Sequence, residues 1–161
     1  MSAARRVTVQ RNRLRFAAAH MATFRGDCEP LHGHNYHVIV EVEGELTADS
    51  WLLDFGELKR MTKGILDGLD HRFLLQRESK FLEITETDSS WKVRFGERGY
   101  VFPKGDVVAL PIENTTAERI SEWIAGQLSA ALAAAGASNL SKLTVGVEEM
   151  PGQTGWYTVD L

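Results

Sequence analysis

The sequence predicts an α+β domain built on an antiparallel sheet. Hydrophobic residues alternate in two N-terminal segments, recur at helical spacing in two central segments, and alternate again near the C-terminus. The patterns follow the order β-β-α-insert-α-β-β, in runs rather than in strict strand–helix alternation, which favours α+β over a parallel α/β sheet. A length of 161 residues fits a single domain.

The two N-terminal segments have the period of two that is typical of strands. The first covers about residues 6–20 and carries its apolar residues and its basic residues on opposite phases. The second covers about residues 34–45 and alternates in the same way. One phase of the second segment, extended back by two residues, contains His32, His34, Tyr36, Val38, Val40 and Val42.

Capping boxes mark the start of two helices. Asp54 with Glu57 precedes a helix that runs to about Gly68, and Thr115 with Glu118 precedes one that ends near Gly136. Residues 143–149 and 155–161 predict the last two strands, which a Pro-Gly turn separates. Residues 76–110, between the helices, predict an insert that forms a hairpin or a long flap within the single domain 1–161.

Composition excludes several classes of protein. The formal charge of −4 argues against general nucleic-acid binding. Cys28 is the only cysteine, so an internal disulfide is impossible and a reducing, cytoplasmic location is expected. No apolar run approaches the ~20 residues of a membrane-spanning helix, and no targeting segment is recognisable.

Three histidines predict a metal site. His32 and His34 lie two positions apart in a strand, so both imidazoles project from one face and can bind one metal ion. His20 ends the apolar phase of the preceding strand, and antiparallel pairing would bring these strand ends together. Three core histidines bonded to backbone or carboxylate groups are the alternative, but a shared zinc ion would satisfy all three rings at once. It would also keep a fourth position open, as in catalytic zinc sites.

Two further motifs suggest proton-transfer chemistry. Cys28, four residues before His32, can act as a thiolate base or nucleophile if a nearby cation lowers the pKa of its thiol. The alternatives are a small buried hydrophobe or a fourth zinc ligand. Asp70 next to His71 can orient the imidazole for a proton relay, although an ordinary solvated pair at the end of a helix has the same sequence.

Glu149 is a carboxylate on the apolar phase of the strand at 143–149. Such a group can bind a guanidine-like edge of a ligand with both oxygens. The alternative is a residue at the end of the strand that has simply reached solvent. Glu148 points the other way and is expected to be an ordinary surface acid.

Taken together, these residues resemble the 6-pyruvoyl-tetrahydropterin synthase / 6-carboxytetrahydropterin synthase family. The matching pieces occur in family order and cover the chain from about residue 14 to the C-terminus, apart from the insert. They are FAAAH at 16–20, CEPLHGHNY at 28–36, LDF at 53–55 with LK at 58–59, LDH at 69–71, NTTAE at 114–118 and VEE at 147–149.

The resemblance implies the tunnelling fold (T-fold), a four-stranded antiparallel sheet with two helices on one face. It also implies homo-oligomers, trimers or hexamers, with active sites between subunits. The site residues that it implies fall into three groups. They are His20, His32 and His34 as zinc ligands, Cys28, Asp70 and His71 as the catalytic group, and Glu149, Thr115 and Thr116 as pterin contacts.

The implied substrate is 7,8-dihydroneopterin triphosphate, a small molecule, with no nucleic-acid or membrane partner. One branch of the family forms 6-pyruvoyl-tetrahydropterin. The other releases acetaldehyde and forms 6-carboxytetrahydropterin on the route to queuosine. The three-residue gap between Cys28 and His32 favours the carboxy-forming branch, with the pyruvoyl-forming branch and a non-catalytic zinc-containing interaction module as alternatives.

Overall fold

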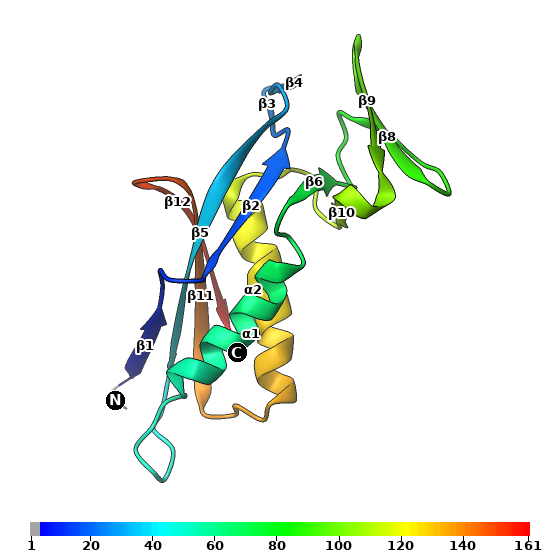
Figure 1. The fold of residues 1–161 in the computed structure, drawn as a ribbon. Coiled ribbons are helices and arrows are strands. Elements are labelled where there is room, and N and C mark those ends of the chain that lie inside the picture. The colour runs from blue at the N-terminus through cyan, green and yellow to red at the C-terminus, as the bar shows by residue number, and fades with distance from the viewer. Residues whose placement is uncertain (1–3) are drawn as a thin grey trace.

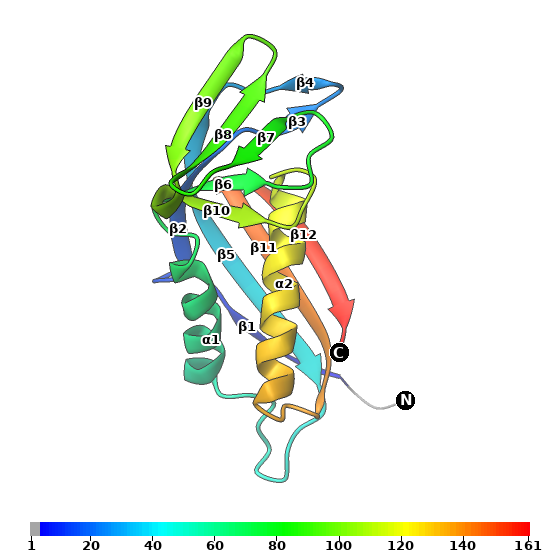
Figure 2. The same ribbon diagram turned by 90° about the vertical axis from the view of Figure 1, so that its right-hand side faces the viewer.

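A computed structural model describes residues 4–161, and its main feature is one long curled sheet with two helices against one face (Figures 1 and 2). Its central strand is β5 (His32–Gly44), which pairs antiparallel with its neighbours on both edges. One edge holds β1 (Arg5–Val9) and β2 (Arg15–His20), and the other holds β11 (Leu140–Met150) followed by β12 (Gln153–Asp160).

The N-terminal segment that alternates over residues 6–20 is two strands, not one. β1 pairs with the far end of β5 and β2 pairs with its beginning. Arg11 and Asn12, in the turn between them, both have positive φ angles, of 64° and 53°. The alternating pattern continues through this turn, so the break could not be recognised from hydrophobicity alone.

The sheet is mixed, so the expectation of a purely antiparallel, four-stranded sheet is corrected. Strands β2, β5, β11 and β12 are antiparallel neighbours as expected. Beyond β2, however, β6 (Arg72–Gln76) and β10 (Val107–Leu110) continue the sheet in parallel pairing.

Both predicted helices are confirmed. In α1 (Phe55–Asp67), the Asp54 side chain caps the helix by accepting a hydrogen bond from the Glu57 amide at 2.8 Å. In α2 (Ala117–Ala134), the cap is Thr116, one residue later than the capping box suggested. The two helices and the sheet face beneath them enclose the main apolar core, which includes Phe16, Val38, Leu58 and Leu128. No helix within residues 4–161 is long and apolar enough to cross a membrane.

The segment predicted as a hairpin or flap contains a small separate sheet. β7 (Glu83–Glu86), β8 (Ser90–Phe95) and β9 (Arg98–Pro103) form three antiparallel strands, and a short 3-10 helix (Lys104–Asp106) leads from them to β10. This sheet lies at the same end of the molecule as the two-stranded ribbon of β3 (Thr23–Phe24) and β4 (Asp27–Cys28) (Figure 1). A second apolar cluster fills the space beneath it, and stacked Phe73 and Phe102 rings, 4.2 Å apart, belong to this packing.

Candidate metal centre and active site

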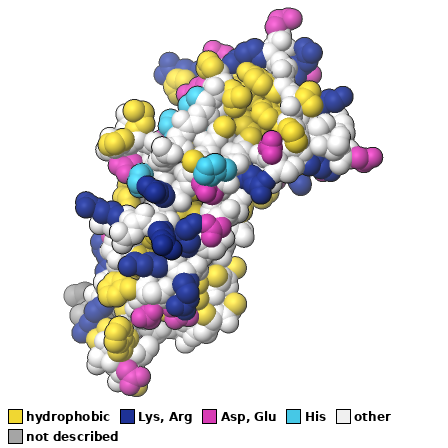
Figure 3. All heavy atoms as spheres, viewed as in Figure 1, with side chains coloured by type: hydrophobic (Ala, Val, Ile, Leu, Met, Phe, Trp, Pro, Cys, Tyr) yellow, Lys and Arg dark blue, Asp and Glu magenta, His cyan; other side chains and the backbone are white. Residues whose placement is uncertain are grey.

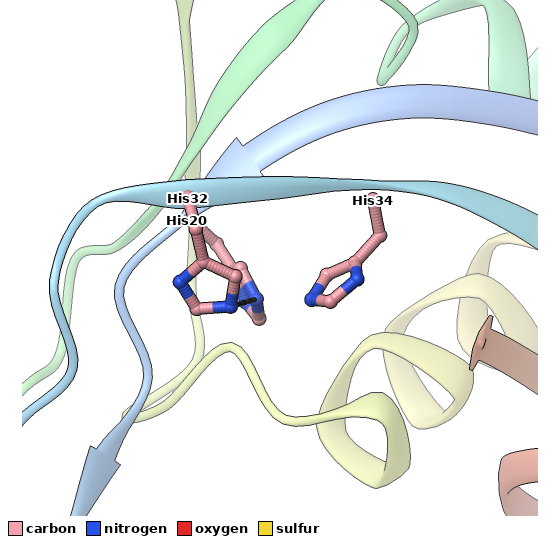
Figure 4. Close-up of side chains that lie close together, drawn as sticks. All are labelled: His20, His32 and His34. Carbon is pink, nitrogen blue, oxygen red and sulfur yellow. Dashed lines mark hydrogen bonds between the residues drawn. The ribbon is translucent and has the colours of Figure 1, made fainter.

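The register of β2 against β5 brings the three histidines together. His20 pairs directly with His32, and Ala18 pairs with His34, so the predicted meeting of the strand ends is confirmed. The strands can approach closely here because Gly33 lacks a side chain. A Cβ at that position would lie 2.8 Å from the Ala18 carbonyl oxygen, which is too close. Figure 4 shows all three rings on one side of β5. One nitrogen from each ring lies within 4.8 Å of the other two.

Backbone carbonyls fix which ring nitrogen faces the centre of the cluster. His20 Nδ1 donates to the Thr115 carbonyl oxygen at 2.9 Å, and His32 Nδ1 donates to the Pro30 carbonyl oxygen at 2.8 Å. A carbonyl oxygen can only accept, so each Nδ1 carries the hydrogen and each Nε2 of a neutral ring has a lone pair. These two Nε2 atoms face each other at 3.2 Å. Two lone pairs at this separation are stabilised by a shared cation.

Burial favours the neutral form of His20 and His34, which is the form of an imidazole that binds a metal. His20 is 1% exposed, and this burial is the main reason why its pKa is lowered to about 4. The two neighbouring histidines lower the pKa further, whereas the hydrogen bond to Thr115 raises it. Burial and His32 also lower the pKa of His34. The residues present therefore fit a single metal ion with three imidazole ligands.

Two side chains beside the cluster were not among the predicted site residues. A Glu29 carboxylate oxygen lies 3.8 Å from His32 Nε2. The ring of Tyr36 is fully buried against His34, at 5.3 Å between centroids, and its hydroxyl has no hydrogen-bond partner among the described residues. Tyr36 could have been recognised by its spacing, because it follows His32 and His34 on the same face of the strand.

Cys28 lies in β4 rather than in an irregular loop, and its side chain is 4% exposed. Burial raises the pKa of the Cys28 thiol, whereas the positive charge of Arg98 lowers it and the acids Asp27 and Glu29 raise it. Cys28 is not part of the group of potential metal ligands found within the described chain. The expectation of a lowered thiol pKa concerns Cys28 beside a bound cation, and it stays a prediction.

A hollow of about 410 Å³ adjoins the histidine cluster at His20, and Glu149, a predicted ligand contact, lines it. Burial raises the pKa of Glu149, with further contributions from the negative charges of Glu29 and Glu118. Thr116 lines the same hollow. The buried Thr115 hydroxyl instead donates to the Gln76 side chain at 3.4 Å, so Thr115 contributes to the cluster through its carbonyl group.

Asp70 and His71 form a dyad on a different surface. Asp70 accepts a hydrogen bond from the Ala17 amide at 2.8 Å, which lowers the pKa of its carboxyl group, and its other oxygen lies 3.0 Å from His71 Nδ1. The His71 side chain is 83% exposed. The dyad lines a hollow of about 550 Å³ with Asn35 and His37.

Strand alternation separates this hollow from the metal cluster. Asn35 and His37 alternate with His34 and Tyr36 along β5, so they project from the opposite face of the sheet. Arg13, Arg15 and Lys63 line the dyad's hollow as well, and Figure 3 shows basic side chains gathered beside histidines on this side of the molecule. Within one chain, the structure thus brings the three histidines together but does not place Asp70 and His71 in the pocket beside them.

The fold and the cluster define an α+β protein with three histidines arranged to hold one metal ion. The family model described as 6-pyruvoyl tetrahydropterin synthase matches residues 8–160, so the chain belongs to this family of enzymes. A Methanocaldococcus jannaschii protein with the provisional name 6-carboxy-5,6,7,8-tetrahydropterin synthase is 32% identical over 145 residues, which are 89% of each chain.

Solved structures show the same relationship. One is a Plasmodium vivax 6-pyruvoyltetrahydropterin synthase in which a glutamate described as a catalytic residue is replaced by alanine. It is 29% identical with a TM-score of 0.92, covering 99% of this chain and all of that chain. The Plasmodium falciparum 6-pyruvoyl tetrahydropterin synthase is 28% identical with a TM-score of 0.89, at the same coverage.

Proposed function

We propose that the protein is a zinc-dependent 6-carboxytetrahydropterin synthase. It converts 7,8-dihydroneopterin triphosphate to 6-carboxy-5,6,7,8-tetrahydropterin, acetaldehyde and triphosphate. The observation that carries this proposal is the cluster of His20, His32 and His34, with two Nε2 lone pairs facing each other. The name of the Methanocaldococcus relative supports the carboxy-forming branch.

His20, His32 and His34 are the zinc ligands in this proposal. Imidazole nitrogens suit zinc, and three protein ligands keep a coordination position for a substrate oxygen. Zinc, when bound, supplies Lewis-acid polarisation of the substrate's side-chain hydroxyls. The carbonyls of Thr115 and Pro30 hold the Nδ1 atoms of two of the rings, so their Nε2 atoms would be free to bind the ion.

Cys28 and the Asp70–His71 dyad are the proposed proton-transfer groups. Cys28 acts as general base on the substrate side chain, and nearby positive charge favours the thiolate that this role requires. Asp70 orients His71 through the 3.0 Å contact to Nδ1, so that the other ring nitrogen is directed at the substrate as acid or base. Glu149, with Thr115 and Thr116 near it, holds the pterin by accepting two hydrogen bonds from its guanidine-like edge.

We further propose that the active site is shared between subunits of a trimer or hexamer. Asp70 and His71 line one face of the sheet and the three histidines lie on the other. A single substrate can contact both groups if the dyad comes from a neighbouring chain. The His71 side chain, 83% exposed in one chain, is accessible for such a contact.

The second candidate function is 6-pyruvoyl-tetrahydropterin synthase, and the observation that favours it is the TM-score of 0.92 to a Plasmodium enzyme of that name. That enzyme has a catalytic glutamate, and here Glu29 lies next to His32. Glu29 is therefore a second candidate base beside Cys28. A non-catalytic zinc-containing interaction module is the third alternative.

Identification of the reaction products tests the proposal. Zinc-loaded protein is incubated with 7,8-dihydroneopterin triphosphate, and acetaldehyde and pterin products are separated by chromatography and mass spectrometry. Acetaldehyde together with 6-carboxytetrahydropterin supports the proposal. A 6-pyruvoyl product assigns the protein to the other branch, and absence of turnover with zinc bound favours the interaction module.

A further inference from the structure

The insert contacts the segment that carries Cys28. The β8–β9 hairpin turns at Gly96, whose φ is +56°, and closes by pairing Phe95 with Arg98. The guanidinium carbon of Arg98 lies 5.4 Å from the centre of the Phe95 ring, a cation–π contact that restrains the side chain. Arg98 is therefore held at the tip of the hairpin instead of extending freely into solvent.

From this position Arg98 reaches Cys28 across 70 residues of sequence. Its Nη2 atom donates a hydrogen bond to the Cys28 carbonyl oxygen. The Cys28 side chain packs in the second apolar cluster, to which β8 contributes buried Trp91 and Val93. The insert thus binds the backbone of Cys28 and belongs to the same apolar cluster as its side chain.

These two contacts have opposite effects on the thiol. Covering it with apolar side chains disfavours the thiolate, as burial does for any acid that becomes negatively charged. The guanidinium of Arg98 favours the thiolate, and it acts against both this burial and the negative charges of Asp27 and Glu29. An insert that packed on Cys28 without Arg98 would make the thiol a weaker base.

We propose that Arg98 is a positioning residue for Cys28, which fixes its backbone through the carbonyl group and supplies the positive charge beside its thiol. The 76–110 insert would accordingly be part of the reaction machinery rather than a peripheral addition. The catalytic meaning of this proposal rests on the function proposed above. The contact itself, and its effect on the thiol, can be measured without substrate.

The test is the pH profile of alkylation of zinc-loaded, full-length protein by iodoacetamide, followed by intact mass. Because Cys28 is the only cysteine, the label reports on this thiol alone. In R98Q we expect the midpoint to rise by about one pH unit, as for loss of a nearby opposite charge. R98K keeps the charge, so its midpoint should lie closer to that of the unchanged protein than to that of R98Q.

R94Q is the matched control. Arg94 belongs to the same hairpin, but its side chain donates to the Gly96 carbonyl oxygen at 3.2 Å rather than to Cys28. Its profile should coincide with that of the unchanged protein. The proposal is overturned if the alkylation profile of R98Q coincides with that of the unchanged protein, or if R94Q shifts the midpoint as much as R98Q does.

Turnover measurements separate this inference from the proposed function. If R98Q shifts the alkylation midpoint and also lowers kcat at neutral pH by about tenfold, as one unit of pKa implies, both stand. If the midpoint shifts while the unchanged protein does not turn over dihydroneopterin triphosphate, the proposed function fails and the role of Arg98 toward the thiol stands.

Discussion

His20 and His32 face each other through their Nε2 atoms, 3.2 Å apart, while their Nδ1 hydrogens are donated to backbone carbonyls. Two ligands in a tetrahedral zinc site, each about 2.0–2.1 Å from the ion, are separated by about 3.3 Å. The His20–His32 separation is therefore already close to that of two zinc ligands. The fold holds it there through strand register and two carbonyl hydrogen bonds.

Replacement of His32 by alanine should abolish stoichiometric zinc binding. When a metal-ligating side chain loses its hydrogen-bond partner, metal affinity falls about 10–100-fold. Removal of the ligating side chain itself should therefore lower the affinity by more than this. Zinc content after dialysis, measured by mass spectrometry of the metal, checks the prediction. His37→Ala is the control, because His37 alternates to the other face of β5. Full zinc content in His32→Ala would refute the assigned ligand set.

Replacement of Cys28 by alanine should abolish turnover and leave zinc content intact. The reason is that Cys28 does not belong to the ligand group formed by the three histidines. Zinc analysis and product formation are measured on the same preparation. A loss of zinc in Cys28→Ala would make this residue a ligand and contradict its role as a base.

Two inactive variants should restore activity when they share an oligomer. Cys28→Ala lacks the proposed base, and His71→Ala lacks the dyad on the other face of the sheet. Co-expression of both, with a different affinity tag on each, yields mixed oligomers in which some interfaces pair an intact Cys28 with an intact His71. Activity in mixed oligomers, but not in a mixture without subunit exchange, is the expected result. Inactive mixed oligomers would place the whole site within one chain.

The sequence predicted the histidine cluster because the meeting of these three side chains depends on local strand geometry. Alternation in two strands puts His20, His32 and His34 on the apolar phase, and antiparallel pairing is enough to bring them together. The parallel pairing of β6 with β10 could not be predicted. The two strands are separated by a 30-residue segment whose hydrophobic pattern is irregular. For the same reason, nothing in the sequence indicated that Arg98 would lie against Cys28.

The metal-free protein should lose stability as the pH falls from about 6.5 to 4. Burial lowers the pKa of His20 to about 4, so in this range the unfolded chain binds a proton that the folded chain excludes. The lowered pKa of His20 costs no stability above about pH 6.5. Near pH 4 it lowers the free energy of unfolding by about 3 kcal/mol. Urea unfolding of chelator-treated protein measures it. His20→Gln removes the titrating group and should flatten this part of the pH dependence, whereas equal slopes for both proteins would refute the prediction.

Replacement of Glu149 by glutamine should weaken substrate binding more than it disturbs the fold. An amide presents one acceptor oxygen and an NH2 group to the pterin edge, so a charge-assisted pair of hydrogen bonds is lost. A hydrogen bond to a charged group contributes about 1.5–3 kcal/mol, so KM should rise by roughly 10- to 150-fold. Glu148→Gln is the matched control, because Glu148 is the adjacent acid and accepts a hydrogen bond from the Gly152 amide at 2.8 Å. Steady-state kinetics on both variants decides the matter: an unchanged KM in Glu149→Gln, or an equal rise in Glu148→Gln, would exclude Glu149 as the pterin anchor.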